Sequence, residues 1–259
     1  MKNKPKIAIF DFTDCEGCEV ALVSLREKLV EIATETEIVN WRLAQKKADD
    51  GPYDIVLIEG TPITQTEIDT LKFLRGQTKI LVGLGSCATL AGIPGIIDKE
   101  ARSGWYEKIY GKDYKPRGID ALPLSAYVLV DYSIHGCPVD KSELLRVIQE
   151  LLAGKTPKNP GYSVCFECKL AGNPCRLLDK KPCLGPITAG GCGAICIKGG
   201  SPCYGCFGIR QDAQVDNLVM TLRKFSDPAK IENYFSMFLK KTPEYKKLFD
   251  NKKERNGKP

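Results

Sequence analysis

The twelve cysteines are the residues of this sequence with the clearest capacity for chemistry. Eight of them form two downstream sets of four, with two, six and seven residues between successive members of the first set and three, six and two in the second. The first downstream set is Cys165, Cys168, Cys175 and Cys183, and the second downstream set is Cys192, Cys196, Cys203 and Cys206. Thiolates are soft ligands that bind zinc ions and iron–sulfur clusters. This density of thiols therefore predicts two metal centres.

Zinc ions and iron–sulfur clusters are the two alternatives for the downstream sets. Zinc sites usually pair Cys-x-x-Cys units and often include histidine, whereas this sequence contains a single histidine, His135. Purely thiol ligands at irregular intervals, among many glycines and prolines, favour four-iron clusters. The division into two sets of four is itself an assumption, because the ligands of neighbouring clusters can interleave along a chain.

The other four cysteines each follow a predicted β-strand, and we call them the sheet-edge set: Cys15, Cys18, Cys87 and Cys137. Loops at the carboxyl edge of a parallel sheet meet at one place, so these thiols are expected to converge on a third metal or cluster site. A redox pair of thioredoxin type is the alternative for the Cys-x-x-Cys pair, and the two further cysteines at strand ends disfavour it. Glycines beside these cysteines fit a cluster held close to backbone amides.

Several polar residues near the sheet-edge set could carry protons or meet a partner. We expect Asp11, Asp14 and Glu16 to be solvated or to cap a helix, rather than to transfer protons. His135 is expected to have a structural role.

The elements that must position the sheet-edge set alternate between short β-branched runs and helical patterns, which is typical of a parallel α/β sheet. The sequence predicts strands over residues 6–12, 36–41, 54–60, 79–85 and 126–132. It predicts helices over 18–33, 64–75 and 139–154. The first should bury an apolar face made of Val20, Leu22, Val23, Leu29 and Ile32. Thr64 and Glu67 have the spacing of a capping box at the start of the second.

A linker rich in proline, glycine and lysine separates this part from the downstream cysteines, and it predicts two domains over residues 1–157 and 158–259. The cysteine-rich segment has too few large apolar side chains to fold around a core, so bound metal is expected to hold it. Near the end of the chain we predict an amphipathic helix followed by a lysine-rich tail, the apolar side of the helix being Ile231, Tyr234, Phe235, Phe238 and Leu239.

Composition narrows the function classes. The sequence has no secretory or twin-arginine pattern and no apolar run of spanning length, so we expect a cytoplasmic protein without membrane contact. In a reducing compartment, many cysteines indicate metal or redox chemistry rather than disulfides. The formal charge of +6 does not require a nucleic-acid partner, because three oxidised four-iron clusters with their thiolates would add roughly −6.

The motifs "DCEGCE", "GSCATLAGIPG", "HGCP" and "SPCYGC" together resemble those of the small, electron-transferring subunit of nickel–iron hydrogenases, especially the soluble archaeal sulfhydrogenase or NADP-reducing type. The likeness covers almost the whole chain. It implies a flavodoxin-like domain followed by a small, irregular iron–sulfur domain. It also implies three [4Fe-4S] clusters, with the sheet-edge set holding the proximal cluster, the second downstream set the medial cluster and the first downstream set the distal cluster.

Departures from the periplasmic members of that family refine these expectations. Cys165 stands where those members have histidine, and Cys196 stands where they often have proline, so the resemblance implies a complete four-iron medial cluster. Gly17 and Thr89 stand where oxygen-tolerant members have additional cysteines, which implies an ordinary four-cysteine proximal cluster.

The same resemblance implies that catalysis belongs to partner subunits and that this chain has no catalytic residue. The partners would be a nickel–iron large subunit, together with flavin and iron–sulfur subunits that reduce NADP, or sulfur and polysulfide, in a heterotetramer. A viologen- or coenzyme-reducing hydrogenase is the nearest alternative. A complex I subunit is disfavoured because its cluster motif begins with adjacent cysteines. A free-standing ferredoxin-like carrier and a zinc-stabilised module that binds nucleic acid through the basic tail are alternatives from other classes.

Overall fold

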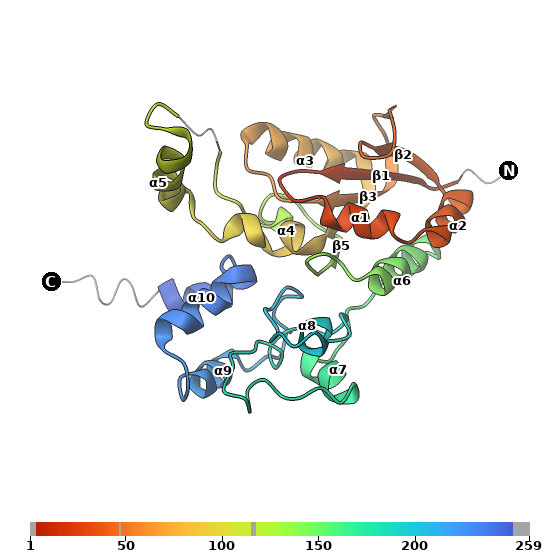
Figure 1. Cartoon of the computed structure of the whole chain (residues 1–259). Coiled ribbons are helices and arrows are strands. Elements are labelled where there is room, and N and C mark those ends of the chain that lie inside the picture. The colour runs from red at the N-terminus through yellow and green to blue at the C-terminus, as the bar shows by residue number, and fades with distance from the viewer. Residues whose placement is uncertain (1–3, 47, 115–117, 251–259) are drawn as a thin grey trace. The chain divides into compact units, whose positions relative to one another are not determined.

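The computed structural model describes residues 4–46, 48–114 and 118–250 (Figure 1). The chain divides into two compact units, which we call the sheet unit (Met1–Pro157) and the cysteine-rich unit (Lys158–Pro259). The predicted lysine-rich tail lies mostly in residues 251–259, outside the described residues. Within the described ranges, none of the helices is both long enough and apolar enough to cross a bilayer.

The sheet unit contains five parallel strands in the order β2-β1-β3-β4-β5. Their bounds are β1 (Lys6–Asp11), β2 (Glu37–Trp41), β3 (Tyr53–Glu59), β4 (Thr78–Leu84) and β5 (Tyr132–Ile134). One row of side chains crosses the whole sheet, in the order Trp41, Ile9, Leu57, Val82 and Tyr132. This strand order is that of the flavodoxin-like doubly wound fold. The predicted fold class and the first four strands are thereby confirmed.

The fifth strand was predicted wrongly, over residues 126–132. These residues instead begin at a 3-10 turn, η2 (Leu124–Ala126). The side chains of Val128 and Val130, which follow it, pack against a hydrophobic core of the sheet unit. The Asp131 amide donates to the Leu81 carbonyl oxygen, and the Asp131 carboxylate accepts from the Leu81 amide at 2.7 Å. Regular pairing with β4 therefore begins after Asp131.

Helices cover both faces of the sheet (Figure 1). Leu22 of α1 (Gly17–Val23), Ile32 of α2 (Glu27–Glu35) and Leu144 of α6 (Lys141–Leu152) belong to one core. Leu71 of α3 (Gln65–Gln77) and Ala88 of α4 (Gly85–Leu90) belong to the core of the opposite face. The remaining elements of the unit are the 3-10 turn η1 (Ile93–Gly95) and α5 (Lys99–Tyr110).

The helix predicted over residues 18–33 is two helices, because Arg26 lies between α1 and α2 with a positive φ of 51°. The predicted apolar face is only partly buried. Val20 and Val23 are exposed, whereas Leu22 and Ile32 are buried. The predicted capping box is present: the Thr64 hydroxyl accepts from the Glu67 amide, and the Glu67 carboxylate accepts from the Thr64 amide.

The cysteine-rich unit is made of short helices joined by irregular loops. Its elements are α7 (Val164–Leu170), α8 (Ile195–Lys198), α9 (Val215–Leu222), α10 (Pro228–Leu239), α11 (Pro243–Tyr245) and the π-helical turn η3 (Lys246–Asp250). Cysteines themselves form part of its core, whose buried members are Val164, Cys168, Cys183, Ala194, Ile197 and Cys203. The predicted amphipathic helix is α10, which buries Ile231, Phe235, Phe238 and Leu239.

Candidate functional site

The sheet unit brings the four cysteines of the sheet-edge set together at the carboxyl ends of its strands. Cys15 and Cys18 follow β1, Cys87 lies in α4 directly after β4, and Cys137 follows β5. The pKa of the Cys87 thiol is raised to about 12, chiefly by burial and also by the neighbouring Cys137 and Cys15. Burial also raises the pKa of Cys18, and Glu59 and Cys87 add to the effect. The four thiols are therefore electrostatic neighbours.

Glycines let the backbone approach these thiols closely. A Cβ atom on Gly85, whose φ is +82°, would lie 2.4 Å from the Cys18 Sγ atom, and one on Gly17 would lie 3.2 Å from the Cys15 Sγ atom. The Ser86 amide and hydroxyl both donate to the carbonyl oxygen of Gly136, at 2.7 and 2.8 Å. These bonds join the loop that carries Cys87 to the loop before Cys137.

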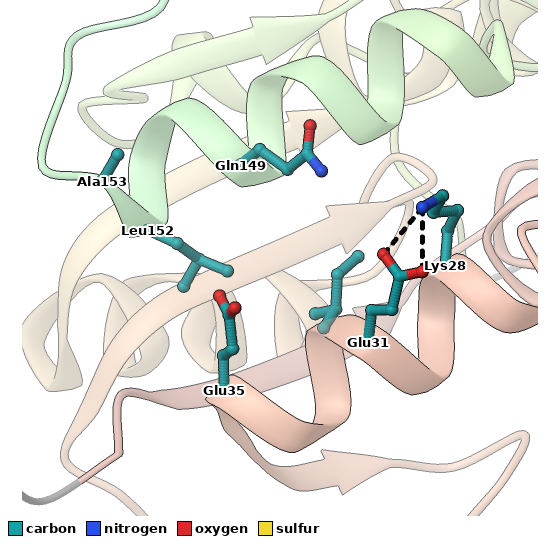
Figure 2. A pocket seen from close by; sticks show the side chains of 7 residues that line it. Lys28, Glu31, Glu35, Gln149, Leu152 and Ala153 are labelled. Carbon is teal, nitrogen blue, oxygen red and sulfur yellow. Dashed lines mark hydrogen bonds and ion pairs between the residues drawn. The ribbon is translucent and has the colours of Figure 1, made fainter.

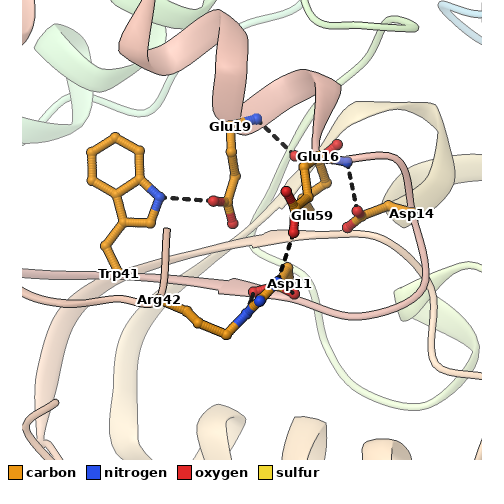
Figure 3. A network of polar contacts seen from close by, with 7 residues as sticks. All are labelled: Asp11, Asp14, Glu16, Glu19, Trp41, Arg42 and Glu59. Atoms are coloured by element: carbon orange, nitrogen blue, oxygen red, sulfur yellow. Dashed lines mark hydrogen bonds and ion pairs between the residues drawn. The ribbon is translucent and has the colours of Figure 1, made fainter. Parts of the chain in front are cut away.

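A buried carboxylate holds the start of α1. Glu59 is the last residue of β3 and is 1% exposed. One of its oxygens accepts from the Cys18 amide at 3.0 Å. The other accepts from the Glu19 amide at 2.7 Å (Figure 3). Glu19 is also buried and accepts from the Trp41 indole at 2.8 Å, and burial raises the pKa of Glu19 to about 7. Glu59 was not identified from the sequence. An acidic residue at the end of a strand that is otherwise apolar could have indicated it, because acidic residues are rarely buried without a partner.

The acids predicted to be solvated or capping form a network with one arginine (Figure 3). The Arg42 guanidinium pairs with Asp11 at 2.6 Å and with Glu16 at 2.8 Å. Asp14 accepts from the Glu16 amide at 2.7 Å, and burial raises the pKa of Asp14 to about 6. These contacts fix the loop that carries Cys15 rather than leaving the acids free in solvent.

His135 packs as a structural residue. Its ring Nδ1 atom lies 2.9 Å from the Thr89 hydroxyl oxygen, and burial lowers the pKa of His135 to about 4. The ring is therefore neutral near pH 7 and carries no charge toward the sheet-edge set.

In the cysteine-rich unit, the first downstream set forms a second group of neighbouring thiols. Cys165 and Cys168 lie in α7. The pKa of Cys165 is raised to about 11, chiefly by burial and also by Cys183, Cys168 and Cys175. A Cβ atom on Gly185 would lie 3.3 Å from the Cys165 Sγ atom and 3.5 Å from that of Cys183. All four thiols of this set thus share one neighbourhood, with the backbone close to it.

The second downstream set lies next to the first. The pKa of Cys192 is raised to about 11, chiefly by burial and also by Glu167 and Cys196. Burial also raises the pKa of Cys203, with Cys183 and Cys206 contributing. The Cys203 amide donates to the Cys183 Sγ atom at 3.4 Å, so a backbone hydrogen bond joins the two downstream sets.

The chemistry of these donor sets fits four-iron clusters. Each such cluster takes four thiolates, and the sheet-edge set and the first downstream set each bring four thiols into one neighbourhood. In the second downstream set, Cys192 neighbours Cys196, and Cys203 neighbours Cys206 and Cys183. Burial raises the pKa of several of these thiols, so a buried thiolate needs a positive partner, which an iron core would provide. The residues of the three sets could therefore hold iron–sulfur clusters.

A groove lies elsewhere on the sheet unit, between α2 and α6, with a volume of about 210 Å³ (Figure 2). Its lining includes Glu35, Gln149 and the ion pair between Lys28 and Glu31, which are 2.8 Å apart. No cysteine of the three sets is among the residues that line it.

Comparison with known proteins gives the family. The family model of the NADH ubiquinone oxidoreductase 20 Kd subunit matches residues 15–151. Sulfhydrogenase 2 subunit delta of Pyrococcus furiosus is 37% identical over 221 residues, which cover 85% of this chain and 92% of that protein. The chain belongs to the family of hydrogenase small subunits. A further relative, a subunit of the vhu F420-non-reducing hydrogenase of Methanocaldococcus jannaschii, is 29% identical over a match that covers 82% of this chain and 84% of that protein.

Solved structures show the same fold in other hydrogenases. An actinobacterial-type NiFe-hydrogenase from Ralstonia eutropha H16 matches with a TM-score of 0.56 at 18% identity, over 99% of this chain and 92% of that one. An NAD+-reducing [NiFe]-hydrogenase matches with a TM-score of 0.54 at 24% identity, over 61% of this chain and 96% of that one. The predicted resemblance is confirmed, and this hydrogenase small subunit is an electron-transfer component of an oxidoreductase.

Proposed function

We propose that this hydrogenase small subunit conducts electrons through three [4Fe-4S] clusters, one in each set of cysteines. The proximal cluster would be held by the sheet-edge set, and the medial and distal clusters by the second and first downstream sets. The observation that carries the proposal is the gathering of four thiols in the sheet-edge set and of four in the first downstream set, with Cys203 of the second downstream set next to Cys183 of the first. When bound, each cluster supplies a site that accepts and releases one electron.

The chain's own residues place, bury and hydrogen-bond these sites. Gly85 and Gly17 leave room for sulfur next to the backbone at the sheet edge, and Gly185 does so in the cysteine-rich unit. The amide of Cys203 donates a hydrogen bond to the Cys183 Sγ atom. This contact supports electron transfer over a short distance between the clusters of the two downstream sets. Burial and amide donors are the means by which a protein adjusts cluster potentials.

The relatives support a proposal about the partners. We propose that the sheet-edge set exchanges electrons with a nickel–iron large subunit. The downstream sets would exchange electrons with flavin and iron–sulfur subunits that reduce NADP, or sulfur and polysulfide. The name of the Pyrococcus furiosus relative, a sulfhydrogenase, supports a sulfur acceptor. The names of the F420-non-reducing relatives support the alternative of a different acceptor in the same position.

The deciding experiment is metal analysis of the anaerobically purified chain with its copurifying subunits. Iron, zinc and acid-labile sulfide are measured together with electron paramagnetic resonance (EPR) spectra after dithionite reduction. We expect about twelve irons and twelve sulfides per small subunit, interacting cluster signals and a copurifying nickel protein. Zinc without labile sulfide would refute the proposal and support the zinc-stabilised module instead.

A further inference from the structure

Tyr234 presents a buried hydroxyl for which the described residues offer no hydrogen-bond partner. It lies on α10, four of whose residues are buried, and neighbouring Phe235 is fully buried. A buried hydroxyl without a partner is unfavourable, and native proteins rarely leave one unsatisfied. A group that accepts a hydrogen bond from the Tyr234 hydroxyl would therefore be stabilising.

The packing of α10 places this hydroxyl at the second downstream set. The ring of Tyr234 stacks on that of Tyr204, with ring centroids 5.0 Å apart and a tilt of 34°. Tyr204 lies between Cys203 and Cys206 in the sequence. Leu239 of α10 reaches the next residue of the same loop: a Cβ atom on Gly205 would lie 3.3 Å from the Leu239 Cδ1 atom.

Three thiols and one further phenol are the largest electrostatic contributors around Tyr234. Burial is the largest cause that raises the pKa of Tyr234 above its ordinary value, and the groups that add to it are Tyr204, Cys183, Cys203 and Cys196. Two of the three cysteines belong to the second downstream set. The hydroxyl stays protonated and can donate, and the acceptors it would meet are the sulfur atoms of these cysteines and of the cluster that they would hold.

Resting on the three-cluster function proposed above, we propose that the Tyr234 hydroxyl donates a hydrogen bond to a sulfur atom of the medial cluster and thereby raises its reduction potential. Reduction adds negative charge to a cluster, and a donor stabilises the more negative state. A helix remote in sequence from the cysteines thus adjusts the middle step of the electron path.

The test compares Tyr234→Phe with the unchanged protein in its anaerobic complex, by redox titration followed by EPR. At the solution potential where the medial cluster of the unchanged protein is half reduced, we expect its reduced-to-oxidised ratio to fall about tenfold in the variant. This corresponds to a downward shift of about 59 mV for one electron. A second readout is the iron–sulfur stretching region of the resonance Raman spectrum, whose shift on transfer to D2O should diminish in Tyr234→Phe.

Tyr204→Phe is the matched control, because it removes a hydroxyl from the partly exposed ring that stacks on Tyr234 and keeps both rings. It should leave the medial potential unchanged. A medial potential that Tyr234→Phe does not lower, or an equal shift in both variants, would overturn the inference while the clusters remain established. Absence of labile sulfide from the unchanged protein would overturn the proposed function together with the inference.

Discussion

The carboxylate of Glu59 offers the sharpest test of how the sheet unit positions Cys18. Its two oxygens each accept one buried amide, from Cys18 at 3.0 Å and from Glu19 at 2.7 Å. Glu59→Gln keeps the size of the side chain but replaces one oxygen by an NH2 group. One of the two amides must then face another donor, and α1 loses a contact at the residue that carries a thiol of the sheet-edge set.

The expected loss of stability follows from the number of bonds. A charge-assisted hydrogen bond contributes about 1.5–3 kcal/mol, and a buried amide left without an acceptor costs about 1–3 kcal/mol. These overlapping effects give about 3 kcal/mol for Glu59→Gln. A unit of this size loses about 2–4 °C in Tm per kcal/mol, so Tm should fall by about 6–12 °C. The measurement is anaerobic thermal unfolding followed by circular dichroism, with iron content measured on the same samples.

Glu67→Gln is the matched control at the start of α3. Glu67 accepts from the Ile63 amide at 2.8 Å and the Thr64 amide at 2.9 Å, but both bonds reach the same oxygen, Oε2. The glutamine carbonyl can occupy that place and keep both bonds, so Tm should change by less than about 4 °C. Equal Tm losses in the two variants would refute the argument that the paired oxygens of Glu59 hold α1.

Three further outcomes are expected. Gly85→Ala places a methyl group 2.4 Å from the Cys18 Sγ atom, so iron content should fall by about one cluster, whereas Gly104→Ala, which meets nothing within 4 Å, should keep full iron. Glu167→Gln keeps an oxygen for the Gly191 amide but removes a charge whose Oε2 atom lies 3.9 Å from the Cys192 Sγ atom. The ratio of reduced to oxidised medial cluster at a fixed solution potential should rise about tenfold, because two charges at that distance interact by about 1–4 kcal/mol. A redox titration that does not change in the variant would contradict this expectation. Chelation of oxidised clusters should make the cysteine-rich unit sensitive to protease before the sheet unit, as gel bands of the fragments would show.

Local patterns predicted the sheet unit well where one short segment determines one element. The capping box of Thr64 and Glu67 and the first four strands depend on neighbours in sequence, and the structure contains them. The position of the fifth strand could not be predicted in this way, because the local sequence fits both a strand and a segment packed on a core. Val128 and Val130 are as suitable for packing on a core as for pairing in a sheet, and tertiary packing determined the outcome.

The break of the first helix at Arg26 was not predictable for the same reason, because the residues around it are ordinary helix formers. At the candidate sites, sequence identified the cysteines but not the residues that contact them from other elements. Glu59 reaches Cys18 across 41 residues of sequence, and Tyr234 reaches the downstream thiols from a separate helix. A sequence pattern shows Tyr234 as one more apolar member of a helix face, since only the fold shows that its hydroxyl has no partner among the described residues.

The two units hold their thiols in physically different ways, and this difference explains the spacing of the cysteines. In the sheet unit, aliphatic side chains on both faces of the sheet form cores that contain one cysteine of the sheet-edge set, Cys18. Its cysteines are consequently far apart in sequence, because strand ends determine where they stand. In the cysteine-rich unit, Cys168, Cys183 and Cys203 are themselves half of the buried residues of a core. On the proposed function, metal binding and folding are coupled there, and the cysteines lie close together in sequence because clusters, rather than a sheet, would bring the loops together.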